Sequence, residues 1–174
     1  MEVIPAMRVA RFEQLEPGEL FLCVDGRDPF YAIKTQKPSS GDRNEMVLLG
    51  PKFVHDVTES FLVAWAPVTV LSFGKTFTIV LPNDPASWSV TGPSREPLCL
   101  AISGDSTYIC TNGGDSPQRY FPCFVDVKTG AIIERRLPEV AAFTNTWEIA
   151  ALGADHLPRA ILKFPLESAA RAPQ

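Results

Sequence analysis

The stretch ELFLCVDGRDPFYAIKT, from Glu19 to Thr35, predicts two strands joined by a tight turn. Its apolar run from Leu20 to Val24 is followed by Gly26 and Asp28, and a second apolar run begins soon afterwards and contains Ile33. Two apolar runs that are separated by a short turn with Gly and Asp are typical of a β-hairpin. We therefore expect this hairpin to be the unit around which the chain is organised.

A second stretch, EPLCLAISGDSTYICTN, from Glu96 to Asn112, repeats this pattern. Its apolar run, Leu98 to Ile102, also ends at a turn with Gly and Asp, and both copies are followed by a polar loop and another apolar strand, Met46 to Leu49 in one and Phe121 to Val127 in the other. The recurrence suggests an internal duplication into two similar β units. The alternative is coincidence, because any two hairpins share such features.

Proline and glycine decide the fold class. The 174 residues contain 16 prolines and 11 glycines, and both residue types interrupt helices. Only three windows of more than ten residues lack both, namely Ala6 to Glu16, Lys52 to Ala66 and Glu139 to Leu152. We expect a strand and a turn in the first, at most a short helical turn before a strand in the second, and strand in the third. The sequence thus predicts an all-β protein, either an antiparallel β-sandwich or two small β-barrel-like units, with ten to thirteen short strands and little helix.

The internal boundary is expected in the segment from Pro82 to Pro97, which contains four prolines and the breaker series Gly92, Pro93 and Ser94. It would divide an N-terminal β unit, residues 1–85, from a C-terminal β unit, residues 86–174, with one continuous domain as the alternative. In the second unit, Lys128-Thr129-Gly130 predicts the turn of another hairpin. Arg159 to Leu166 predicts a final edge strand, where Pro165 is tolerated.

Free, buried thiols are expected for all four cysteines, because each lies in an apolar run and no C-x-x-C spacing occurs. These residues are Cys23, Cys99, Cys110 and Cys123. A turn from Ser103 to Thr107 would place Cys99 and Cys110 on opposite faces of the sheet, where they could not form a disulfide. The two histidines lie far from any pair of cysteines, so we expect neither a metal site nor a cofactor.

Charge and hydropathy limit the classes of partner. The net charge is −4 and no basic run exceeds two residues. The electrostatic field of the protein alone would therefore not attract nucleic acid. The apolar stretches are far shorter than the ~20 residues that span a bilayer, and the N-terminus resembles no secretory signal. We expect a cytoplasmic, bacterial protein without nucleic-acid or membrane partners; a homodimer is left open.

Catalytic motifs are weak in this sequence. His55-Asp56 and Asp155-His156 are the only pairs of an imidazole and a neighbouring carboxylate, and no G-x-S-x-G element supplies a nucleophile. The acids in the turns, Asp105 among them, are explained by local turn formation. A binding or structural/assembly module is therefore favoured. The alternative is an enzyme of unfamiliar, hydrolase-like type with acidic loop residues at a pocket between the two halves.

The candidate ligand site consists of two loops that would be equivalent in a duplicated protein. They are Lys34 to Arg43 and Asn112 to Arg119, and such loops can carry function because they have no core to form. The residues proposed as polar contacts are Lys34, Asp42, Arg43, Asp115 and Arg119, and those proposed as stacking surfaces are Tyr31 and Tyr120. The alternative is that both loops are only solvated connections.

Overall fold

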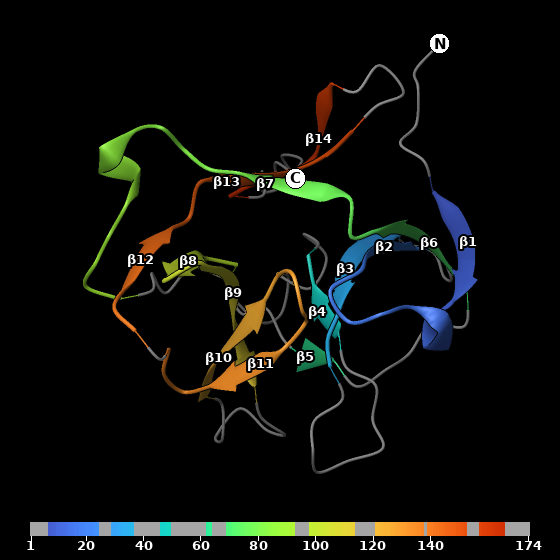
Figure 1. Cartoon of the computed structure of the whole chain (residues 1–174), viewed down its shortest axis with the longest axis horizontal. Helices are drawn as coiled ribbons and strands as arrows, with labels where there is room; N and C mark the ends of the chain where they lie inside the picture. Colours follow the sequence, from blue (N-terminus) through green and yellow to red (C-terminus); the bar gives the residue numbers. More distant parts are fainter. Residues whose placement is uncertain are drawn as a thin grey trace, which may run out of the picture.

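The computed structural model describes residues 7–24, 29–36, 46–49, 62–63, 69–92, 98–113, 121–137, 139–152 and 157–165. Within these ranges the chain forms fourteen strands, arranged in three antiparallel sheets, and two short 3-10 helices (Figure 1). The prediction of an all-β protein with little helix is confirmed, and the strand number is slightly above the expected range. None of the helices in the described ranges is both long and apolar enough to cross a membrane.

The first sheet, sheet A, contains six strands in the order β1-β6-β2-β3-β4-β5. In chain order these are β1 (Arg8–Arg11), β2 (Leu20–Cys23), β3 (Phe30–Lys34), β4 (Met46–Leu48), β5 (Leu62–Val63) and β6 (Thr69–Gly74). The hairpin expected at the start of the chain is present as β2 and β3, with Leu20 opposite Ile33. One face of the sheet packs around Phe12 and Leu15, which lie in and just after the 3-10 helix η1 (Phe12–Gln14).

The second sheet, sheet B, contains five strands in the order β11-β10-β9-β8-β12. They are β8 (Leu100–Ser103), β9 (Ser106–Gly113), β10 (Phe121–Asp126), β11 (Ile132–Glu134) and β12 (Ala141–Thr144). The predicted hairpin around Lys128-Thr129-Gly130 is the β10–β11 pair, in which Gly130 has a φ of 68°. Sheet A contains the series β6-β2-β3-β4-β5 and sheet B the series β12-β8-β9-β10-β11, so successive strands of the two halves take corresponding places.

The register of the β8–β9 hairpin differs from our expectation by one residue. Ser103 is opposite Ser106, so the turn contains only Gly104 and Asp105, and Gly104 takes a φ of 57°. Glycine at the first central position is what a two-residue turn with positive φ there requires. The argument that Cys99 and Cys110 lie on opposite faces of the sheet is therefore wrong.

Cys99 and Cys110 instead share one face of sheet B, where the Cys110 N–H donates to the Cys99 carbonyl oxygen at 2.7 Å. None of the four cysteines forms a disulfide. A hydrogen bond with the Cys99 thiol, together with burial, holds the pKa of the Cys110 thiol well above its usual range. The Cys110 thiol therefore stays protonated near neutral pH and is a poor nucleophile.

The third sheet, sheet C, lies across the other two (Figure 1) and has the order β14-β13-β7. Its strands are β7 (Phe77–Val80), β13 (Trp147–Leu152) and β14 (Pro158–Phe164), and the 3-10 helix η3 (Pro85–Ser87) follows β7. The expected final edge strand is confirmed as β14. Buried residues of all three sheets, such as Leu20, Ile109 and Trp147, form one central core between them.

Two glycines bring the backbones of sheets A and B together. Gly18, just before β2, donates its N–H to the carbonyl oxygen of Lys34 at 2.8 Å, and Gly130 accepts from the N–H of Gln36 at 2.8 Å. A Cβ atom on Gly18 would lie 2.4 Å from the carbonyl oxygen of Lys128, and one on Gly130 would lie 2.7 Å from Gly18 N. This part of the junction between the two halves therefore has room only for glycine.

Candidate functional site

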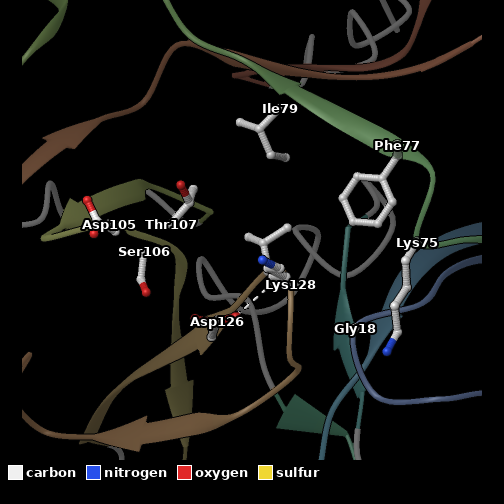
Figure 2. A pocket seen from close by; sticks show the side chains of 10 residues that line it. Gly18, Lys75, Phe77, Ile79, Asp105, Ser106, Thr107, Asp126 and Lys128 are labelled. Carbon is white, nitrogen blue, oxygen red and sulfur yellow. Dashed lines mark hydrogen bonds between the residues drawn. The ribbon is translucent and has the colours of Figure 1, made fainter.

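A cavity of about 250 Å³ lies where the three sheets meet. Strand β7 supplies one wall through Phe77 and Ile79. The β8–β9 turn and the start of β9 supply residues 105–107, and the end of β10 and the turn after it supply residues 126–128. Figure 2 shows Phe77 and Ile79 pointing from β7 towards these turns, with Lys75 at one side of the cavity.

The apolar wall follows from the alternation of side chains along a strand. Phe77 and Ile79 face inward and pack partly against the central core, whereas Thr78 and Val80 are exposed on the opposite face. Neither Phe77 nor Ile79 is fully covered. The wall thus offers apolar surface that a bound group could bury, which favours the entry of an apolar group.

The charged groups at the cavity have mixed signs and partly structural roles. Asp126 Oδ1 accepts hydrogen bonds from the N–H groups of Lys128, at 2.9 Å, and Thr129, at 2.7 Å, so it stabilises its own turn. Lys75 Nζ lies 3.0 Å from Glu16 Oε2 in a solvent-exposed ion pair. Asp105 lies exposed in the β8–β9 turn. The cavity is therefore apolar on the β7 side and polar on the side of the turns.

Strand β7 is an edge strand directly above this cavity. It pairs with β13 along one side, and no described strand pairs with its other side. Val80 and Leu81 at its end are 41% and 37% exposed. An uncovered edge presents backbone N–H and C=O groups to which another extended segment can bind.

The far side of β13, in contrast, is occupied by β14. Trp147 of β13 lies opposite Phe164 of β14, and their rings are stacked with centroids 4.0 Å apart and an interplanar angle of 11°. Trp147 Nε1 also donates to the carbonyl oxygen of Leu98 at 2.8 Å. Both side chains are buried in the central core. This arrangement shows how sheet C covers an aromatic side chain with an added strand.

Two of the predicted ligand residues are described, and neither lines the cavity. Tyr31 lies on β3, packs against the central core with its ring 5.9 Å from that of Phe73, and has a pKa raised by burial. Lys34 is buried, and its Nζ donates to the carbonyl oxygen of Phe12 at 2.9 Å and lies 4.7 Å from the centre of the Phe12 ring. Both side chains thus have contacts within sheet A that stabilise the fold.

The other predicted site residues lie outside the described ranges. They are Asp42, Arg43, Asp115, Arg119 and Tyr120, and both histidine-carboxylate pairs are also outside. Within the described ranges, no three His, Cys, Asp or Glu side chains lie close enough together to hold a metal ion.

Sequence reasoning missed Phe77 and Ile79, although a signal was present. The segment FGKTFTI, residues 73–79, resembles FTNTWEI, residues 143–149, with Phe, Thr, an aromatic residue and Ile at the same four positions. These segments lead into β7 and β13, which pair with each other. The similarity would have indicated that Phe77 corresponds to Trp147.

Comparison with known proteins adds no family or function. No family model, no curated protein and no solved structure shows significant similarity to the chain.

Proposed function

We propose that the protein is a binding module that accepts an extended segment of another protein at the free edge of β7. The observation that carries this proposal is the position of that edge beside a cavity whose β7 wall is apolar and only partly covered. Backbone hydrogen bonds to a strand edge provide affinity, and a neighbouring pocket for alternate side chains provides specificity. The other edge strands lack this combination within the described residues, because β7 is the only edge strand among them whose side chains line the cavity.

The cavity also bears on the enzymatic alternative, since Asp105 and Asp126 both border it. A pair of catalytic carboxylates must both be available to substrate. The Asp126 carboxylate, however, already accepts two backbone hydrogen bonds through one oxygen and is largely buried. This engagement favours binding over hydrolysis at the cavity.

An internal duplication is part of the proposal. It is supported by the corresponding strand order of sheets A and B and by the similarity of residues 73–79 to residues 143–149. Under this interpretation β7 and β13 are equivalent strands, and within the described residues only β13 has a strand on its second edge. The second edge of β7 is then the place at which a partner strand would bind.

The proposal can be tested with a display library of random hexapeptides selected on the wild-type protein. A lysine on an edge strand opposes the addition of another strand. Thr78→Lys on β7 is therefore expected to lower the affinity of the protein for the selected peptides about fivefold or more. Val9→Lys is the matched control, because Val9 lies exposed on the edge strand β1, which belongs to sheet A and not to sheet C.

Selected peptides that bind Thr78→Lys and the wild type equally well would contradict the proposal, as would a library that yields no binder. Loss of binding only in Val9→Lys would instead place the site on β1.

A further inference from the structure

We infer that the partner segment carries an aliphatic residue and, two positions later, an aromatic residue whose ring enters the cavity against Phe77. This inference rests on the proposed function and specifies the partner that the β7 edge recognises. It follows from the symmetry of the β7–β13 pair and from the contacts that β14 makes with β13.

Ile79 of β7 lies directly opposite Ile149 of β13. Two antiparallel strands are related by a local twofold axis through such a pair of opposite residues. Rotation about this axis places Phe77 on Trp147 and Thr78 on Glu148, because each pair is equally distant from the axis along its strand. The same rotation places β14, on the outer edge of β13, at the free edge of β7.

The contacts of β14 then predict the register of the guest strand. Leu162 of β14 lies opposite Ile149, and Phe164 lies opposite Trp147. At β7 the corresponding guest residues would lie opposite Ile79 and Phe77, in the same order along an antiparallel strand. The residue between them would face Thr78, which is solvent-exposed, so its identity is free to vary.

The cavity has room for the aromatic ring. Its volume of about 250 Å³ exceeds the roughly 150 Å³ of an apolar protein cavity that binds benzene. Among the described residues no aromatic ring stacks on Phe77, whereas Trp147 is covered by Phe164 and is only 1% exposed. A guest ring would bury the exposed part of Phe77 and add an aromatic contact, and both effects stabilise the complex.

A suitable probe is the acetylated and amidated hexapeptide RAILKF, which has the sequence of residues 159–164. Its affinity for the protein is measured by isothermal titration calorimetry as a double-mutant cycle. Phe→Ala in the peptide and Phe77→Ala in the protein are each expected to weaken binding about tenfold. Because the two rings contact each other, the peptide change should have little further effect on the Phe77→Ala protein.

Two protein variants serve as controls. Phe77→Trp reproduces the residue of β13 and should retain the peptide affinity, because an aromatic ring remains for the guest ring to contact. Val140→Ala removes an exposed side chain that does not line the cavity, and should leave affinity unchanged. Thermal melting of each variant checks that it is folded.

The inference is overturned if RAILKF does not bind at millimolar concentration, or if the effects of the two Phe→Ala changes simply add. It is also overturned if concentrated protein forms a dimer that Phe77→Ala abolishes while the peptide fails to compete, since the occupant would then be a second copy. RAILKF could fail to bind while the library peptides still bind the wild type more tightly than Thr78→Lys. That result would leave the proposed function intact and refute only this class of partner.

Discussion

Replacing Trp147 by alanine is expected to lower the free energy of unfolding by about 3–5 kcal/mol. Trp147 is almost fully buried at the point where the three sheets meet, stacks on Phe164 and donates a hydrogen bond to the carbonyl oxygen of Leu98. The substitution removes this contact area, opens a cavity and leaves a buried carbonyl oxygen without its partner. Urea denaturation monitored by far-ultraviolet circular dichroism measures the change.

Trp88→Ala is the matched control for this substitution. Trp88 follows η3, is only partly buried, and donates its Nε1–H to the carbonyl oxygen of Pro82 at 3.3 Å. We expect Trp88→Ala to lower the free energy of unfolding by about 1–2 kcal/mol, because less buried apolar area is lost than in Trp147→Ala. Equal losses in the two variants, or a loss below 1 kcal/mol for Trp147→Ala, would show that sheet C is not held to the central core as described.

Gly18→Ala is expected to lower the free energy of unfolding by about 2–5 kcal/mol. Gly18 has a φ of 85°, which strains any residue with a Cβ atom, and the new atom would lie 2.4 Å from the carbonyl oxygen of Lys128. The backbone of the β10–β11 turn would have to move away from the segment before β2. The junction between sheets A and B would loosen in consequence.

Gly74→Ala separates the steric effect from the conformational one. Gly74 also has a positive φ, 66°, but an added Cβ atom there would meet no atom within 4 Å. Gly74→Ala is therefore expected to lower the free energy of unfolding by only about 1–2 kcal/mol, the cost of placing alanine at a positive φ. Chemical denaturation of both variants should show the larger loss in Gly18→Ala. If Gly74→Ala is as destabilising, the two halves do not approach each other at Gly18.

The fold class and several hairpins could be predicted because they depend on local chemistry. Proline and glycine leave little room for helix, and turns such as Lys128-Thr129-Gly130 carry a glycine that takes a positive φ. The register of β8 and β9 was missed because it depends on whether the turn uses two residues or more. Gly104 permits the shorter turn, and the shift by one residue moves Cys99 and Cys110 onto the same face.

The candidate site could not be predicted in the same way, because it is assembled from distant segments. Residues 75–79, 105–107 and 126–128 meet only after three sheets have formed, and strand patterns do not indicate which strands become neighbours. Lys34 was predicted as a ligand contact because it begins a polar loop that would have an equivalent in the second half of a duplicated protein, yet its side chain is buried. The Phe12 ring and carbonyl oxygen, which lie far away in the sequence, account for its burial here.

Addition of a guest strand to the second edge of β7 can be observed by amide hydrogen exchange of the protein with and without saturating RAILKF, read by mass spectrometry. Unpaired edge amides exchange readily, whereas paired ones are protected. We predict that amide exchange in residues 75–81 slows about tenfold or more in the complex, because the guest strand forms hydrogen bonds with the backbone of β7. The exchange rates of residues 8–11 on the edge strand β1 should not change. Protection confined to β1 or to β11, or unchanged exchange at β7 when peptide is bound, would contradict the account.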